Sequence, residues 1–599
     1  MSDFIFSSSP QPEGELSRHI QSIYHHDAPV VTEFHGPWGS LAVSRNLHQG
    51  FQPYETMDHI TVVIGGPVLY FQDNHFLTGD DPVAGTRAIF QLWQNSAMQW
   101  DEDLNGPFVI LVINKKTCQI TCITDLMMFI PVYQFQQGSE VMLGTHVDAL
   151  ARAAGQTGNF DLVSLADFIL HWVITYPYTS YKEIRQCHAA ATHGFERDEQ
   201  GGIRSRKPRH YWLPLEHNPY ENIDQAAMAL RHALQNFIER ITASMREVAH
   251  FVSAGEDSRS LAGLLPKELK RHAYVFLYGM NREGRLAKAA AEAYGSEFYL
   301  ATRAKYHYLE ILPEATDLVG SGQQFLHVHA LGFHRTLQLQ RYPAVFGGFL
   351  ADTLLKAFLK RKIPGYGRLP FLPAFFLPGE TRTKPVKHDL FTGEVLDAIT
   401  RRRRNHFHLV CQIRQKTAHE WFELWPMSMC YGLPNISSNR RLFRSYEPFM
   451  SNEVVKISAA VPMGWKLNRR LFNRAMRPFL YPTRWMFHAD GRLPYFPWWI
   501  NCPIQCAILC TLYLIEIIKP GRANREVWYN WEEIVKTQKW KKMYASYAEN
   551  FINLNLSKKP TQEQRQLLNG KALTMTQKLN LMQVVYSCQK RDDNSPVSD

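Results

Sequence analysis

A change of pattern near residue 226 limits the folds open to this chain of 599 residues. A long amphipathic pattern over 226–246 predicts a helix, and the apolar run 248–252 that follows it predicts a buried strand. Helical and strand patterns then alternate, with a helix at 259–265, a strand at 273–279 and another helix at 284–295. Right-handed crossovers join strands that alternate with helices, so this part is predicted to form a parallel sheet covered by helices.

The first part of the chain has a different pattern. From about 30 to 212, short β-type runs such as "ITVVIGGPVLYF" and "GPFVILVIN" are separated by turns. Together with helical patterns at 88–94 and 162–171, these runs predict a mostly antiparallel two-layer domain. The stretch 209–225 combines proline, asparagine and acidic residues, which indicates a linker.

The length of the chain requires more than one hydrophobic core. The pattern changes divide it into three expected units, which are 1–215, 216–520 and a helical C-terminal extension, 521–599.

The stretch "FVSAGEDSRSLAGLL" joins a predicted strand of the second unit to a predicted helix. In an α/β sheet, ligands bind at the carboxyl ends of strands, beside helix N-termini that favour anions. Ala254 and Gly255 let a phosphate approach the backbone, Ser253 and Ser258 supply hydroxyls, and Asp257 supplies a carboxylate suited to Mg²⁺. The loop lacks the GK[ST] of a Walker A motif, which argues against kinase or GTPase chemistry of that type.

"SAGEDSR" resembles the SGGxDS loop of the PP-loop ATP pyrophosphatases, specifically of the asparagine-synthetase superfamily. Later stretches resemble further family signatures in the same order: "AVFGGFLADTLLK" resembles SGEGxDE, "YEPFMSNEVVKISAAVP" resembles RxPFLD, and "KLNRRLFNRAMRPFLYP" resembles the lysine-containing helix. Upstream, "WDEDLNGPFVILVINKKTCQITCITDLMMFIPVYQF" resembles strands of the family's glutamine-amidotransferase domain. Because these matches are collinear from about residue 35 to 500, the chain is identified as a member of this superfamily.

The resemblance implies a fold and a site. The expected fold is α/β: an N-terminal αββα sandwich of the Ntn-hydrolase type, then a PP-loop (HUP-like) parallel-sheet synthetase domain with a helical C-terminal extension. The resemblance implies that the loop residues bind ATP. It also implies that Asp257 and Asp352 hold Mg²⁺ and that Asp352 takes part in catalysis. Arg470 occupies the slot of the family's catalytic lysine, with Lys466 as the competing candidate.

The first domain departs from the pattern of an active glutaminase. The family needs an N-terminal cysteine as nucleophile, and this chain begins Met-Ser-Asp. Ser2 could serve as a nucleophile in principle, but about 30 polar residues are expected between it and the first strand, which argues for poor placement. Gly65 stands where the family has an oxyanion donor, Arg87 reverses the charge of the substrate anchor, and the Asp125 segment has lost its Arg and Gly. We therefore expect a degenerate domain that serves as a scaffold.

The synthetase part is also altered. Phe349 and Thr353 replace the two glutamates of SGEGxDE, and Tyr446 and Ser451 replace the arginine and aspartate of RxPFLD. The loss of the first glutamate argues against ordinary asparagine synthesis.

Two functions from different classes follow from these comparisons of residues. The favoured one is an ATP-dependent, AMP-forming carbon–nitrogen ligase that adenylates a carboxylate and joins it to an amine without glutaminase activity, as in peptide macrolactam cyclases or in sugar-acid amidation. The alternative is a non-enzymatic binding or regulatory homologue that keeps the fold. A PP-loop nucleic-acid modifier is disfavoured, because neither a sulfur-relay cysteine pair nor an RNA-binding module is evident.

Composition limits the classes of partner and the cellular compartment that we expect. Lys and Arg outnumber Asp and Glu by 66 to 55, which favours anionic partners in general, and the expected ones are ATP and a small-molecule or peptide carboxylate, not nucleic acid. Nine scattered cysteines and the lack of a signal-like N-terminus indicate the cytoplasm. The apolar run "WWINCPIQCAILCTLYLIEIIK" contains polar residues, so a buried or interfacial helix is favoured over a membrane anchor, and membrane association is disfavoured.

Overall fold

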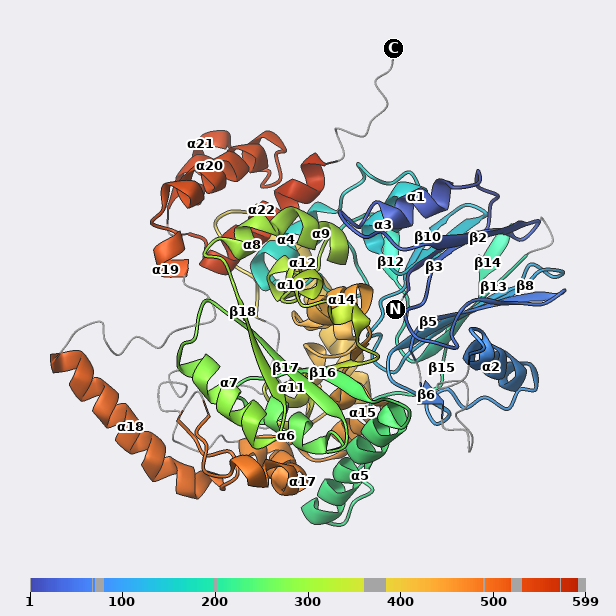
Figure 1. Cartoon of the computed structure of the whole chain (residues 1–599). Coiled ribbons are helices and arrows are strands. Elements are labelled where there is room, and N and C mark those ends of the chain that lie inside the picture. The colour runs from blue at the N-terminus through green and yellow to red at the C-terminus, as the bar shows by residue number, and fades with distance from the viewer. Residues whose placement is uncertain are drawn as a thin grey trace.

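The structure is a computed structural model of the chain (Figure 1). It describes residues 2–66, 68–69, 80–197, 202–359, 384–488, 491–518, 531–570 and 572–590.

The first part of the chain forms two antiparallel sheets whose inner faces share one core (Figure 1). The strand order is β12-β10-β11-β1-β3-β2 in one sheet and β14-β13-β9-β8-β5-β4 in the other, where β15 also pairs with β13. The strands are β1 (Phe4–Ser7), β2 (Val31–Gly36), β3 (Gly39–Ser44), β4 (Tyr54–Glu55), β5 (His59–Gly65), β8 (Phe108–Asn114), β9 (Ile120–Thr124), β10 (Tyr133–Gln137), β11 (Glu140–Gly144), β12 (Ile184–Gln186), β13 (Ala191–Arg197), β14 (Ile203–Ser205) and β15 (Arg209–His210), with β6 (Val68–Leu69) and β7 (Leu104–Asn105) as a separate pair.

Helices cover the outer face of each sheet, which gives the layer order αββα. In β1, Phe4 and Phe6 enter the core between the sheets, whereas Ile5 packs on the outer face. In β5, Val63 likewise faces outward and packs with Ile89. The covering helices are α1 (Glu15–Gln21) and α3 (Val147–Ala153) on one sheet and α2 (Ala84–Gln94) on the other, and α4 (Leu162–His171) follows. The expected mostly antiparallel, two-layer first domain is confirmed.

One expectation about this domain is wrong. The first strand begins at Phe4, and it is a central strand, hydrogen-bonded to β3 and β11 on its two sides. The run "FIFS" is too short to show a period, and the turn residues that follow it hid the strand in the sequence. Ser2 is therefore two residues from a rigid strand and fully buried, so its predicted distance from the sheet does not hold.

The second part contains the predicted parallel sheet. Its order is β18-β17-β16-β19-β20, and each neighbouring pair is parallel. The strands are β16 (Glu247–Phe251), β17 (Lys270–Leu277), β18 (Glu297–Thr302), β19 (Val345–Phe346) and β20 (Ser445–Tyr446), and the helices between them are α6 (Glu256–Leu264), α7 (Arg282–Ala293), α8 (His307–Glu310), α9 (Leu312–Val319), α10 (Phe333–Thr336), α11 (Ala351–Leu355), α12 (Gly393–Ile413), α13 (Ala418–Phe422) and α14 (Leu433–Leu442), with α5 (Ile223–Thr242) before them.

The two faces of this sheet have separate cores. Val248 and Phe346 pack with α5 and α6, and Val275 packs with α7. On the opposite face, Tyr274 and Phe276 pack with residues of the 330–345 segment. After β20 come α15 (Asn452–Ala460), α16 (Met463–Lys466), α17 (Arg470–Leu480) and α18 (Trp498–Ile518).

The C-terminal helices complete a core that begins much earlier in the chain. They are α19 (Trp531–Ile534), α20 (Gln538–Asn553), α21 (Thr561–Asn569) and α22 (Met575–Gln589). Leu581 and Phe551 belong to one cluster with Phe168 of α4 and Leu318 of α9. The predicted extension 521–599 thus packs on both of the other predicted units.

Candidate functional site

Hydrogen bonds hold the loop between β16 and α6. The Ser253 N–H donates to Ser258 Oγ (3.0 Å), the Gly255 N–H donates to Ser253 Oγ (3.0 Å), and the two hydroxyl oxygens lie 2.9 Å apart. The Ala254 N–H donates to Glu283 in the first turn of α7 (2.6 Å). The predicted loop residues therefore lie together at the carboxyl end of β16, beside the N-terminus of α6, a position that favours anions.

The second predicted segment meets this loop because β16 and β19 are parallel neighbours. A Cβ placed on Gly348 would lie 3.4 Å from the Asp257 Cβ, so the two loops are in contact. Asp352, in the first turn of α11, brings its carboxylate close to those of Glu256 and Asp257, and the three ligand atoms lie within 4.8 Å of one another. The structure thus brings Asp257 and Asp352 together and adds Glu256, which lies in the quoted loop but was not predicted.

Lys356 lies among the three carboxylates, and the sequence did not single it out. Its Nζ is 2.8 Å from Glu256 Oε1 and 2.9 Å from Asp352 Oδ1, and it also pairs with Asp257. Its side chain is only 3% exposed. Burial opposes the charge of Lys356, but the carboxylates outweigh it and raise its pKa. Burial raises the pKa of Asp257 to about 7, against the opposing effect of Lys356.

Two arginines also reach Glu256. Arg469 donates from Nε to Glu256 Oε1 (2.5 Å), and Arg492 lies 3.7 Å from Oε2. Burial disfavours ionisation of Glu256, but Lys356, Arg469 and Arg492 together hold its pKa well below the usual value. Cationic side chains therefore surround the N-terminus of α6.

The structure places the two predicted basic candidates elsewhere. Arg470 is exposed and donates to the Gly464 carbonyl (3.5 Å), whereas its neighbour Arg469 faces the loop. Lys466 is buried 3.5 Å from Glu420 and donates to Ser458 Oγ (3.1 Å). Asn468 and Arg469 both have left-handed backbone angles, with φ of 55° and 61°. This turn rotates the chain at the start of α17, and no residue pattern in the sequence indicates it.

The donor set fits a hard divalent cation, because carboxylate oxygens from two loops converge at one point. In this arrangement the Lys356 ammonium supplies the positive charge at that point. A metal ion held by Asp257 and Asp352 would therefore share or take over the place of the ammonium group.

A further acid lies behind the second loop. Glu447 is buried, and its Oε2 accepts from the Phe349 N–H (2.9 Å). A Cβ on Gly347 would come 2.1 Å from Glu447 Oε1, so a glycine is needed there. Burial raises the pKa of Glu447 to about 8, while the bond from Phe349 lowers it. Next to it, Tyr446 hydrogen-bonds His48 Nδ1 of the first domain (2.9 Å). Glu447 was not predicted as a site residue, because it matches no family motif position.

The N-terminus of the chain is closed off by the second domain. Asp3 accepts from Arg440 (2.6 Å) and from Arg441 (2.8 and 2.7 Å), and Arg440 also donates to the Ser2 carbonyl (2.7 Å). All four residues are buried. The Ser2 hydroxyl has no hydrogen-bond partner among the described residues.

The structure also shows where the other residues that depart from the glutaminase pattern lie. Arg87 pairs with Asp81 (2.9 Å) on the surface. Gly65 ends β5 with φ of 104°. Asp125 is buried and accepts backbone N–H bonds from Met127 and Phe129 (both 3.0 Å), which organise the turn after β9.

Comparison with known proteins supports the family assignment of the first domain. Residues 41–212 match the model of the glutamine amidotransferase domain, so this part is a glutamine amidotransferase-like domain. A search of curated proteins found no match.

Two solved structures show weak similarity. An allosteric regulatory enzyme of purine biosynthesis has 8% identity and a TM-score of 0.22, over 50% of this chain and 80% of that one. A glutamine phosphoribosylpyrophosphate amidotransferase from B. subtilis, complexed with ADP and GMP, has 10% identity and a TM-score of 0.21, over 50% of this chain and 65% of that one. Similarity at this level adds nothing to the account of the site.

Proposed function

We propose that this chain is an ATP-dependent amide-bond-forming enzyme of the asparagine-synthetase type, with a PP-loop synthetase domain in its second part. The observation that carries the proposal is the meeting of Asp257 and Asp352 at the carboxyl ends of two adjacent parallel strands. Far apart in sequence, these carboxylates converge beside a helix N-terminus and a serine-rich loop. Open α/β sheets bind ligands at such an edge.

In the proposed reaction, a carboxylate oxygen attacks the α-phosphorus of ATP and pyrophosphate leaves. An amine then attacks the acyl carbon, and AMP leaves with the bonding electron pair. Mg²⁺ held by Asp257 and Asp352 would neutralise phosphate charge. Ser253 and Ser258 orient the pyrophosphate, and Arg469 supplies the cation that the sequence comparison assigned to Arg470.

The first domain acts in this proposal as a scaffold without glutaminase activity. Arg440 and Arg441 occupy the space around Ser2 and Asp3, which leaves the N-terminal hydroxyl enclosed. The amine therefore comes from a source other than glutamine.

The non-enzymatic alternative also has a supporting observation. Lys356, Arg469 and Arg492 already supply three positive charges to the three carboxylates, so the cluster is balanced without a metal ion or a nucleotide. A homologue that only keeps the fold would retain this arrangement.

Calorimetric titration of the purified chain with ATP and Mg²⁺ tests the proposal. Asp257→Ala should weaken binding at least tenfold, because it removes a metal ligand beside the loop. Asp397→Ala, at an exposed position of α12, is the matched control and should bind as the unaltered chain does. Unchanged binding by Asp257→Ala would show that the loop is not the nucleotide site.

A further inference from the structure

In the first part of α18, two polar side chains lie inside and a large aromatic side chain lies outside. Asn501 and Gln505 are 4% and 6% exposed, whereas Trp499 is 62% exposed. Asn501 accepts from the Leu493 N–H (2.7 Å) and donates to the Phe496 carbonyl (2.9 Å). A surface helix of a water-soluble domain shows the opposite pattern, so the outer face of α18 is suited to an apolar medium.

The second half of α18 carries a broad exposed apolar face. Tyr513, Leu514, Ile515, Ile517 and Ile518 are between 39% and 72% exposed, and steps of about 100° per residue place them over about 200° of the helix circumference. Figure 1 shows this half of α18 projecting from the body at the lower left. A helix that lies along a membrane surface buries one broad apolar face in the lipid, and this distribution fits that arrangement.

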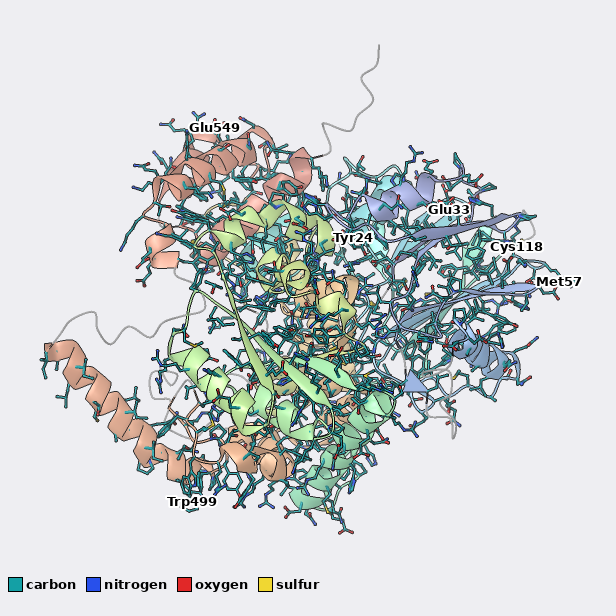
Figure 2. The ribbon with its side chains drawn as sticks, viewed as in Figure 1. Tyr24, Glu33, Met57, Cys118, Trp499 and Glu549 are labelled. Carbon is teal, nitrogen blue, oxygen red and sulfur yellow. The ribbon has the colours of Figure 1, made fainter. Side chains whose placement is uncertain are left out.

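An exposed aromatic patch lies at the base of the helix. It comprises Tyr481, Trp485, Phe487, Trp498 and Trp499, and Figure 2 labels Trp499 at this end of α18. More than half of the exposed large hydrophobic side chains in the described residues lie between Tyr481 and Ile518. Aromatic side chains are favoured at the boundary between lipid and water.

Basic groups lie among these rings. The Arg484 guanidinium is 4.1 Å from the Tyr481 ring centre, and the Arg477 guanidinium is 4.9 Å from that of Tyr495. Cations next to interfacial aromatics favour anionic headgroups. The net charge of +11 acts in the same direction.

The path of the chain rules out a single membrane crossing. Within the described residues, one stretch, Trp498–Ile515, is long and apolar enough to cross a membrane by length and composition. However, Lys539 pairs with Glu310 (2.7 Å) and Trp540 packs in the same cluster as Tyr308, so the helices described after α18 pack on the body. The twelve residues between Ile518 and Trp531 are too few for a second helical crossing, which takes about 20.

We propose that α18 and the aromatic patch form a membrane-surface anchor, with α18 lying along the interface of an anionic lipid bilayer and the body of the protein on one side. This inference does not depend on the proposed enzymatic function. It would bring the candidate site to the membrane, because Arg259 links the two: it donates to the Ala254 carbonyl (2.8 Å) of the loop and to the Phe487 carbonyl (2.5 Å) of the patch.

Flotation of the full chain with vesicles tests the anchor. The chain should float with vesicles of phosphatidylcholine and phosphatidylglycerol (3:1) at low salt, and less with phosphatidylcholine alone. The double variant Leu514→Glu/Ile518→Glu should reduce the vesicle-bound fraction at least tenfold, because it places two charges on the lipid-facing surface.

The matched control is Met57→Glu/Leu409→Glu, which places two charges at exposed apolar positions far from α18 in sequence, and it should float like the unaltered chain. The inference is overturned if the unaltered chain floats with neither vesicle type, or if the α18 double variant still floats. It is also overturned if the chain is a dimer in solution that the α18 variant dissociates and that does not bind vesicles, because a second copy then covers the helix.

Discussion

At the scale of single residues, Lys356 is the most consequential side chain in the candidate site. Its ammonium group contacts all three carboxylates that could bind a metal ion. An ammonium group and a divalent cation compete for the same oxygen atoms, since both are held there by charge. Lys356 is therefore expected to weaken metal binding to the empty site and to keep the cluster stable without metal.

Lys356→Met tests this competition. The variant should bind Mn²⁺ at least tenfold more tightly, as measured by electron paramagnetic resonance of the free ion. Its melting temperature should fall in EDTA and recover with Mn²⁺, because Glu256, Asp257 and Asp352 then lose the ammonium group that they share. The control Lys288→Met removes an exposed lysine of α7 and should change neither property. Equal or weaker Mn²⁺ binding by Lys356→Met would refute the competition.

Glu447 gives a prediction about pH. Its pKa is about 8 in the folded chain, above the ordinary value of 4.5, because it is buried. The folded state thus keeps a proton on Glu447 that the unfolded state releases. The stability that folding gains relative to an ionised, buried Glu447 is fully present below about pH 4.5 and is lost as the pH rises towards 8. Glu447→Gln should flatten the pH dependence of the free energy of unfolding between pH 5 and 8. An unchanged slope in urea unfolding would show that Glu447 is ionised in the folded chain.

At the scale of elements, the contact between α6 and α17 holds the N-terminus of α6 in place. Gly263 permits it, because a Cβ there would lie 2.5 Å from the Phe479 carbonyl oxygen. Gly263→Ala should lower the free energy of unfolding by about 1–3 kcal/mol, as measured in urea. Gly393→Ala, in the first turn of α12 with nothing within 4 Å of the added Cβ, should have no such effect. A neutral Gly263→Ala would mean that α17 moves away without loss.

The elements also show what the sequence could predict. Alternating strand and helix patterns predicted the parallel sheet, and the family motifs predicted which loops meet. Two features could not be predicted from the sequence. The strand β1 has only four residues, which is too few for a period. The left-handed turn at Asn468 and Arg469 selects which arginine reaches Glu256, and such a turn leaves no residue pattern.

At the scale of the whole molecule, a buried ion cluster joins the two sheet-bearing parts. Asp3 of the first domain is paired with Arg440 and Arg441 of α14, and all three side chains are at most 2% exposed. The arginines hold the pKa of Asp3 well below its usual value, although burial opposes this. The C-terminal helices likewise pack on α4 and α9, which come much earlier in the chain, and this explains why motif reading did not find these contacts.

Asp3→Ala tests the importance of this junction. It leaves two arginines buried without their counter-ion, so the free energy of unfolding should fall by about 3–5 kcal/mol. Asp81→Ala breaks an exposed pair with Arg87 and should change stability by less than about 1 kcal/mol. Similar effects of the two substitutions in denaturant unfolding would mean that the junction contributes no more than a surface pair.

In the proposed function, ATP bound at the loop after β16 is cleaved between its α- and β-phosphates. Phosphorus-31 NMR of the chain incubated with ATP and Mg²⁺ tests it most directly, because even slow turnover in water identifies the bond that breaks. We expect AMP and pyrophosphate, in equal amounts, and their loss in Asp257→Ala. Formation of ADP and phosphate by the purified chain, abolished by the same substitution, would contradict it.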